Sequence, residues 1–200
     1  MEDASGEVKA CVRAQVHHPT TDASKLGVYK SAIAKHPEWQ GTFSQALKTE
    51  MDLARLLQIP MLEVGGLALH ESVRGTSAVL KLVIAIYGLA KNVGGAVGLS
   101  TVTTRHGASS ILRRLGGESM SHSGIAVPPY YDPQYRCDME VLKFYSWKPS
   151  LRHEARFAEV QQFTTQEVSK QWQTSRPAER SPQIHENALA DRVMTLNAYA

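Results

Sequence analysis

Apolar side chains follow a strand-like spacing in some segments of the chain and a helix-like spacing in others. Residues 7–16 carry an apolar side chain at every second position, which predicts a strand with one buried face. From Thr42 onward the apolar residues share one helical face, and Pro60 ends this helix. The stretch between them predicts a loop with at most one short helix, near residues 26–35. Residues 137–144 alternate again and predict the last main strand.

The middle third of the chain predicts a strand, a buried helix and a second strand in that order. Residues 61–69 are strand-like but contain two adjacent glycines, which inside a strand indicate a bulge or a close backbone approach. Residues 78–92 are apolar almost all round, as expected of a buried helix. Residues 97–103 supply the second strand, so the crossover predicts a parallel pair.

A short second helix follows these elements. Ala108, Ile111, Leu112 and Leu115 form its apolar stripe, and two glycines end it. Together the elements predict an α/β fold. Residues 1–148 make up this predicted domain.

The last quarter of the chain has a different composition. Residues 149–200 are rich in Gln, Glu, Arg and Ser, which indicates a polar extension. A helix is expected near residues 154–173, followed by a loose segment around 175–183.

The start of the chain resembles half of a hairpin. Asp3–Gly6 is a turn signature that normally joins two antiparallel strands, yet only two residues precede it. We therefore expect that a partner strand is missing from this sequence. An incomplete sheet would favour association with another chain, so self-association is one expectation.

Composition narrows the class of protein. The 200 residues, 42% of them hydrophobic, suffice for one sizeable core and exclude a large multidomain machine. The net charge of +3 suits acidic or phosphorylated partners but is low for a dedicated nucleic-acid binder, so no nucleic-acid partner is expected. The basic start of a signal peptide is absent, and the longest apolar stretch, residues 78–90, is too short for a membrane span. A cytoplasmic protein is expected.

Several other chemistries have weak support in the sequence. Cys11 and Cys137 lie in apolar, strand-like runs, which favours buried reduced thiols, with one disulfide as the alternative. The eight histidines lack a metal-ligand spacing with cysteine, so we expect no metal. Ser109 and Ser110 lack the glycine context of a serine hydrolase. The tyrosine- and proline-rich residues 127–135 predict either a structured connection or the wall of a pocket.

A turn of small residues leads into the buried helix and is a candidate anion site. The first turn of a helix has free N–H groups and a dipole that favours negative charge. The residues of this candidate site are Arg74, Gly75, Thr76, Ser77 and Ala78. The alternative is that the turn only redirects the chain and that a Thr76 or Ser77 side chain caps the helix.

These motifs resemble the GNAT superfamily of N-acyltransferases, and the resemblance implies a GNAT-like mixed sheet with helices on both faces. The family combines a bulged strand, a pyrophosphate loop written R-G-x-G-x-G or with alanine last, a buried helix, another strand and a short helix. Here the loop reads Arg-Gly-Thr-Ser-Ala-Val over residues 74–79, with Ser77 and Val79 at the later glycines. The short helix keeps Ala108 of the family pattern, whereas Arg105 replaces its asparagine and Leu112 its tyrosine. The strand and helices that open a GNAT domain are not found in this sequence.

The resemblance implies transfer of an acyl group from acyl-CoA, or from the phosphopantetheine of an acyl carrier protein, to a primary amine. Glu63 is the implied base, and the backbone N–H groups near Leu67 and Leu69 are implied to bind the oxyanion. The loop residues, together with Arg105, would hold the donor's phosphates. The alternative for Glu63 is a structural ion pair with an arginine such as Arg13.

Within the superfamily, residues 63–69 and the later Arg-Arg-Leu-Gly-Gly look most like N-acyl amino acid synthases and acyl-homoserine-lactone synthases. An amino acid is therefore one possible acceptor. Because a usual tyrosine is absent at Leu112, the thiolate would need another acid or would leave unassisted. A non-catalytic binder of acyl thioesters, or an incomplete domain that needs a partner chain, are the alternatives. Arg105, Arg113 and Arg114 would form either a docking patch for the carrier protein or a solvated helix face.

Overall fold

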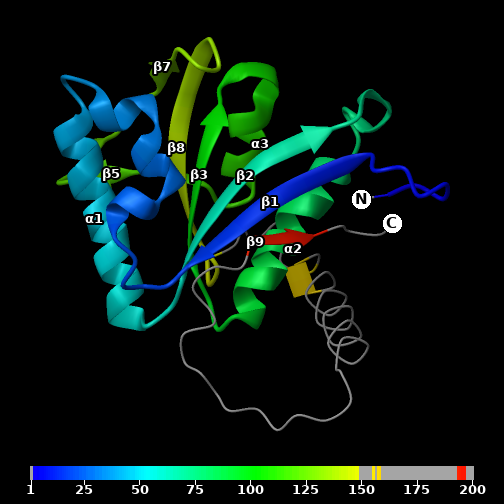
Figure 1. Cartoon of the computed structure of the whole chain (residues 1–200), viewed down its shortest axis with the longest axis horizontal. Helices are drawn as coiled ribbons and strands as arrows, with labels where there is room; N and C mark the ends of the chain where they lie inside the picture. The colour runs from blue at the N-terminus through cyan, green and yellow to red at the C-terminus, as the bar shows by residue number, and fades with distance from the viewer. Residues whose placement is uncertain (1, 149–154, 156, 159–192, 197–200) are drawn as a thin grey trace, which may run out of the picture.

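The computed structural model describes residues 2–148, 155, 157–158 and 193–196. It shows an α/β fold in which a mixed sheet lies between helices on its two faces (Figure 1). The main elements are β1 (Ala10–His17), α1 (Gln40–Leu57), β2 (Met61–Leu69), α2 (Ala78–Asn92), β3 (Val97–Thr103), α3 (Ala108–Arg114) and β8 (Cys137–Tyr145). The predicted strands and helices are therefore confirmed, with ends that differ by a few residues.

Shorter elements fill the connections. The stretch before α1 holds three 3-10 turns: η1 (Ala23–Lys25), η2 (Gly27–Lys30) and η3 (Ala32–Lys35). The others are η4 (Glu71–Val73), η5 (Arg105–Gly107), β4 (Glu118–Ser119), β5 (Ser121–His122), β6 (Ile125–Ala126), β7 (Tyr130–Asp132) and β9 (Val193–Leu196). The tyrosine- and proline-rich segment thus contains β7, a short strand paired with β8.

The strands of the main sheet follow the order β4-β8-β3-β2-β1-β9. The crossover through α2 makes β2 and β3 parallel, as predicted, whereas β1 with β2 and β3 with β8 are antiparallel. The predicted helix over residues 154–173 and the loose segment beyond it lie almost entirely outside the described residues. Phe157, which is described, is helical and buried, and its ring lies 4.8 Å from that of Tyr87.

The two faces of the sheet bury separate apolar clusters. On one face, Phe43 and Leu47 of α1 pack with Met61 of β2 and with residues of β3 and β8. On the other face, α2 and α3 pack through residues such as Val83 and Leu112. Strands β2, β3 and β8 therefore have apolar residues facing both helix layers, whereas β1 buries its apolar residues on the α2 side alone. This pattern fixes the register of the sheet.

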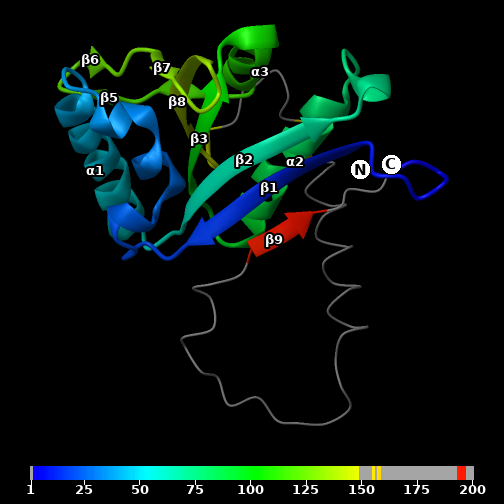
Figure 2. The same cartoon turned by 45° about the horizontal axis from the view of Figure 1, so that its top comes forward.

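The strand β9 was not predicted from the sequence. It pairs antiparallel with β1, with Val12 opposite Leu196 and Gln15 opposite Val193 (Figure 2). The outer edge of β1 is thus partly covered by a distant segment of the same chain. The possibility that another chain supplies a strand stays a prediction.

The turn at the start of the chain joins a minimal hairpin. Asp3 accepts a backbone hydrogen bond from Gly6, and Glu2 forms an isolated antiparallel bridge with Val8. This bridge involves one residue pair and is no strand, so the expectation that a partner strand is missing stays a prediction. Both cysteines are free thiols, with Cys137 buried and Cys11 half-buried.

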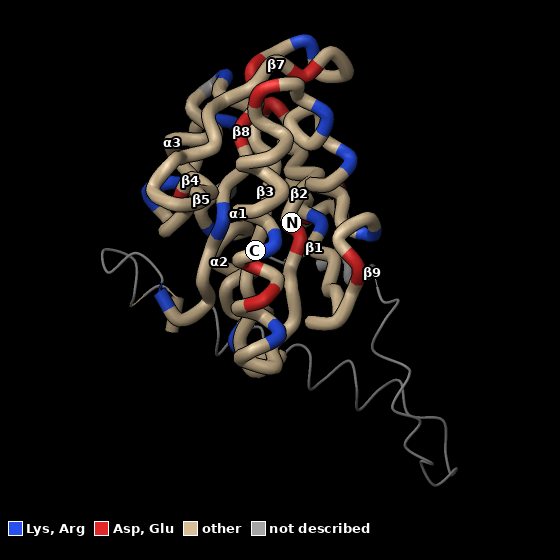
Figure 3. The backbone as a smooth tube through the Cα atoms, turned by 90° about the vertical axis from the view of Figure 1, so that its left-hand side faces the viewer, with Lys and Arg blue, Asp and Glu red and all other residues tan. Residues whose placement is uncertain are grey.

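Charged residues of both signs are interspersed along the described part of the chain (Figure 3). Within that part, no helix has the length and apolar character needed to cross a membrane.

Candidate functional site

The parallel strands β2 and β3 pair for only three residues and then diverge. The last pair is Glu63 with Leu99, after which β2 continues along β1 to Leu69 and β3 continues along β8 to Thr103. Figure 1 shows the two strands moving apart toward their carboxyl ends. Among the described strands none fills this gap, so an edge of β2 faces it without a strand partner.

A β-bulge lies on β2 just beyond the point of divergence. Gly65 pairs with Arg13 and Ala68 pairs with Cys11, so two residues of β2 lie opposite one residue of β1. Gly66, inside the bulge, has a φ of 63°, in the left-handed region that glycine adopts readily. The bulge predicted from the paired glycines is therefore confirmed.

This bulge yields a prediction with a built-in control. A Cβ added at Gly65 would meet no atom within 4 Å, and one added at Gly66 would make an ordinary contact with Arg13 Cβ at 3.6 Å. Of the two, only Gly66 has a positive φ. Gly66→Ala is expected to lower the free energy of unfolding by about 1 kcal/mol more than Gly65→Ala does. Urea unfolding of the two variants measures this difference, and equal effects would show that the bulge tolerates any residue.

The candidate anion site follows directly after the carboxyl end of β2. Beyond η4, Gly75 has a φ of 75°, and the Thr76 hydroxyl donates to the carbonyl oxygen of Val73 across 2.7 Å. Ser77 is the N-cap residue of α2, yet its side chain makes no capping hydrogen bond. Arg74 is exposed. The turn therefore presents the start of α2 and one guanidinium group at the open end of the divergence.

Leu67 and Leu69, predicted to offer backbone N–H groups, both lie on β2 beyond the divergence. Leu69 pairs with Ala10 of β1, and Leu67 lies in the bulge with 38% of its surface exposed. Ala78 is the first residue of α2. The structure thus brings the β2 residues and the turn residues of the predicted site to one end of the sheet.

Glu63 is held by three donors at the last paired position of β2. Its Oε1 accepts from the Val28 N–H across 2.7 Å, and its Oε2 accepts from the Gly27 N–H across 2.7 Å and lies 2.9 Å from His17 Nε2. Burial by itself would raise the pKa of Glu63, but the hydrogen bonds from His17, Gly27 and Val28 outweigh it. Its pKa therefore lies below the ordinary value.

These contacts correct one alternative from the sequence. The ionisable partner of Glu63 is His17, at the end of β1, and not Arg13. The carboxylate attaches η2 to the sheet on the face that α1 covers. The attachment of η2 to Glu63 cannot be predicted from the local sequence, because Gly27 and Val28 bind the carboxylate through their backbone N–H groups.

The second helix is anchored by a buried carboxylate that sequence reasoning missed. Glu140 of β8 accepts hydrogen bonds from the Ser109 hydroxyl and from the Arg113 guanidinium, both on α3. Arg113 is thus engaged in a structural ion pair, whereas Arg114 is exposed and donates to the Ser110 carbonyl oxygen. In a docking patch made of all three arginines, the charge of Arg113 would be offset by Glu140.

Arg105 lies in η5, just before α3. Its guanidinium donates to the carbonyl oxygen of Arg136 across 2.6 Å, and its backbone N–H donates to the Thr103 hydroxyl. These contacts attach the start of α3 to the turn before β8. Leu112, at the position of the family's tyrosine, is buried.

The comparisons with known proteins show only distant likeness. No protein-family model matches the chain, and no curated protein is similar to it. The structure is similar to Arabidopsis thaliana NAA60 in complex with acetyl-CoA, at 10% identity and a TM-score of 0.45, over 72% of this chain and 70% of that chain. It is similar to the arylalkylamine N-acetyltransferase 7 of the mosquito Aedes aegypti, at 11% identity and a TM-score of 0.46, over 73% of this chain and 62% of that one.

A third similar structure is the apo form of an agmatine N-acetyltransferase mutant. It is 17% identical, with a TM-score of 0.43, over 70% of each chain. Because all three TM-scores are below 0.5, the function has to be inferred from the site itself.

The geometry of this site suits an extended ligand that carries an anion at one end. A gap with an open strand edge offers backbone hydrogen bonds to a polar chain, and the adjoining helix start offers N–H groups and Arg74 to an anion. On the face that α1 covers, Glu63 supplies a negative charge beside the gap.

Proposed function

We propose that the chain is a GNAT-type N-acyltransferase that moves an acyl group from a thioester donor to a primary amine. The observation that carries the proposal is the divergence of β2 and β3 after Glu63 and Leu99, with a bulge on β2. The donor is acyl-CoA or the phosphopantetheine of an acyl carrier protein. An amino acid acceptor, as in the N-acyl amino acid synthases, is a narrower version of the same proposal.

The donor would lie in the gap. Its phosphopantetheine arm carries amide groups that can pair with the open edge of β2, much as an added strand would. Its phosphates would meet Arg74, the turn from Gly75 to Ser77 and the first residue of α2, Ala78. The thioester carbonyl would then lie near the bulge, where the N–H groups near Leu67 and Leu69 would stabilise the oxyanion. Arg105 would approach the phosphates only if it released Arg136.

The reaction requires that a neutral amine attack the thioester carbon. The new C–N bond forms as the C–S bond breaks, the amine loses a proton, and CoA leaves as a thiolate. Glu63 is the proposed acceptor of that proton. Since its pKa is lowered, it binds a proton weakly and would pass it on to solvent. With Leu112 at the tyrosine position, the thiolate would leave without that acid.

A non-catalytic thioester binder is the second candidate, and one observation favours it. Three donors already occupy the carboxylate of Glu63, which leaves about one acceptor site, on Oε1, for a proton from the amine. Such a protein would bind the donor in the same gap and release no thiol.

Release of free thiol from acyl-CoA separates the two candidates. The full chain is mixed with acetyl-CoA, butanoyl-CoA or an acylated carrier protein, and with a panel of primary amines that includes amino acids. Amine-dependent thiol release that Glu63→Gln reduces at least tenfold supports the acyltransferase and the role of Glu63. Donor binding without release supports the binder, and absence of both contradicts the proposed site.

A further inference from the structure

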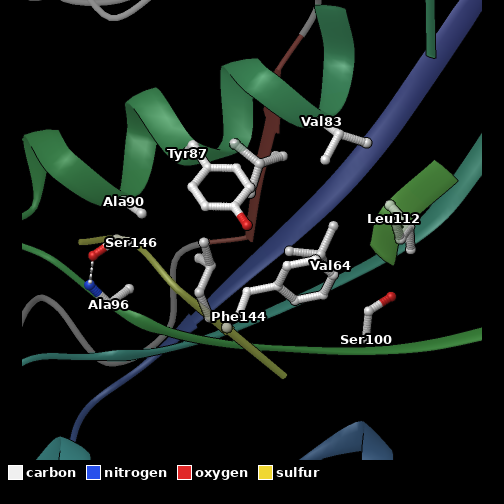
Figure 4. A pocket seen from close by; sticks show the side chains of 12 residues that line it. Val64, Val83, Tyr87, Ala90, Ala96, Ser100, Leu112, Phe144 and Ser146 are labelled. Carbon is white, nitrogen blue, oxygen red and sulfur yellow. Dashed lines mark hydrogen bonds between the residues drawn. The ribbon is translucent and has the colours of Figure 1, made fainter. Parts of the chain in front are cut away.

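An apolar cavity of about 30 Å³ lies between α2 and the sheet (Figure 4). Its walls come from α2, α3, β2, β3 and β8. Two of the three hydroxyls at its surface already have partners within the protein. Ser146 Oγ accepts from the Ala96 N–H across 2.9 Å, and the Tyr87 hydroxyl donates to the Leu115 carbonyl oxygen across 2.8 Å. The cavity therefore offers an apolar surface to a ligand.

The cavity begins beneath the paired part of β2 and β3. Leu62 and Gly98 are paired with each other and line it. Side chains alternate along a strand, so Val64 and Ser100 face the same side one step further on, past the last pair, and they line it as well. The cavity thus extends from the closed part of the parallel pair to the gap in which the donor is proposed to lie.

The two faces of the gap differ in chemistry. On the side of α1, the Glu63 carboxylate and the His17 ring are hydrogen-bonded beside it. On the side of α2, the walls are apolar apart from the hydroxyls. An apolar chain attached to the thioester carbon is more stable against the apolar face, and a cationic amine is attracted to the face with the carboxylate.

We propose that this cavity binds the end of the donor's acyl chain, a subsite that rests on the proposed function. The acyl chain then leaves the thioester toward α2, and the amine approaches from the side of Glu63. Donor and acceptor groups thereby reach the thioester carbon from opposite faces of the sheet.

The size of the cavity limits the chain length. A cavity volume of roughly 10 to 15 Å³ is needed to hold one water molecule. The cavity of about 30 Å³ therefore has room for about two or three ligand atoms. A butanoyl group, with three carbons beyond the carbonyl, matches this space. Each methylene that leaves water tightens binding about fourfold, so butanoyl-CoA should bind about fifteenfold more tightly than acetyl-CoA.

The ring of Phe144 is a rigid wall of the cavity. It is edge-on to Tyr87, with ring centroids 6.2 Å apart. Glycines leave space for it on two sides: a Cβ at Gly98 would lie 3.1 Å from Phe144 Cβ, and a Cβ at Gly117 would lie 3.0 Å from Phe144 Cε1. Because the ring cannot shift freely, longer acyl chains should bind less tightly than butanoyl.

The test reduces the volume of the cavity by placing a larger side chain on α2. Ala90 of α2 lines the cavity, whereas Ala85, on the same helix and equally buried, does not. Thermal unfolding of full-length wild type, Ala90→Val and Ala85→Val is followed with CoA and with acetyl-, butanoyl-, hexanoyl- and octanoyl-CoA. We expect the largest midpoint shift with butanoyl-CoA for wild type and Ala85→Val. For Ala90→Val, butanoyl-CoA should no longer raise the unfolding midpoint more than acetyl-CoA does. The midpoint shift produced by CoA itself should persist.

A second variant tests the proposal independently if Ala90→Val does not fold. Phe144→Leu enlarges the cavity and should move the optimum to hexanoyl-CoA. Equal shifts along the acyl series in every variant would overturn the acyl subsite and leave donor binding intact. If neither CoA nor any acyl-CoA shifts the wild-type midpoint, the proposed function itself fails.

Discussion

Replacing Glu63 by alanine is expected to lower the free energy of unfolding by about 2 kcal/mol. The carboxylate bridges β2 to the backbone of η2 and to His17. Without it the Val28 N–H and the His17 ring, both buried, lose a partner, whereas the exposed Gly27 N–H can turn to water. Urea unfolding at neutral pH measures the loss.

Glu118 provides the matched control for this substitution. Its ion pair with Lys148 is exposed on both sides, so Glu118→Ala should cost less than about 1 kcal/mol. If Glu63→Ala costs no more than Glu118→Ala, the attachment of η2 does not depend on the carboxylate. Glu63→Gln keeps the side-chain shape and one acceptor oxygen, so it should fall between the alanine variant and the wild type.

The lowered pKa of Glu63 also predicts how stability depends on pH. Because the folded pKa lies below the ordinary value of 4.5, ionisation of Glu63 stabilises the fold at any pH above that value. This contribution is lost as the pH falls through the folded pKa. Between about pH 5 and pH 3, wild type should therefore lose more stability than Glu63→Gln. The comparison isolates Glu63, since other carboxylates titrate alike in both proteins, and identical slopes would contradict the shift.

Reversing the charge at Arg74 is expected to weaken binding of CoA about 30-fold, equivalent to about 2 kcal/mol. Arg74 is exposed beside the start of α2, where the helix dipole already favours an anion. A glutamate there would repel the donor's phosphates and cancel part of that attraction. Calorimetric titration of wild type and Arg74→Glu with CoA measures the change, and added salt should reduce the difference.

Lys30→Glu serves as the charge-matched control for Arg74→Glu. Lys30 is exposed on η2, on the opposite side of the sheet, so its reversal should change CoA affinity less than threefold. If both variants weaken binding alike, the effect comes from net charge alone. If only Arg105→Glu weakens it, the phosphates bind near α3 instead of at the turn.

The sequence predicts the elements of this fold well where local pattern decides them. The alternation in β1 and the apolar character of α2 each indicate which faces are buried, and the structure confirms both. In β8 the alternation is less informative, because residues 139–142 are buried on both faces of the sheet. The bulge at Gly66 is also predictable, because glycine weakens a strand interior and typically occurs there at a bulge or a close backbone approach. The order of strands and helices from β2 to α3 follows from the same local signals.

The contacts that define the site are harder to predict from the sequence. Glu63 is bound by backbone N–H groups about 35 positions away, and such groups are the same in every residue type except proline. Glu140 appears as one polar position in an alternating strand until α3 brings Arg113 and Ser109 to it. The strand β9 has only four residues in a polar context, too short for a periodic signal.

The pairing of β9 with β1 has a mechanical consequence. Near the amino end of β1, Val12 lies opposite Leu196 at the carboxyl end of β9. A force applied to the two ends of the chain therefore acts on the same end of this ladder and opens it one residue pair at a time. Shearing, in which all pairs share the load, is avoided by this geometry. The first event under tension should be the low-force release of β9, with the contacts of β1 to β2 still in place.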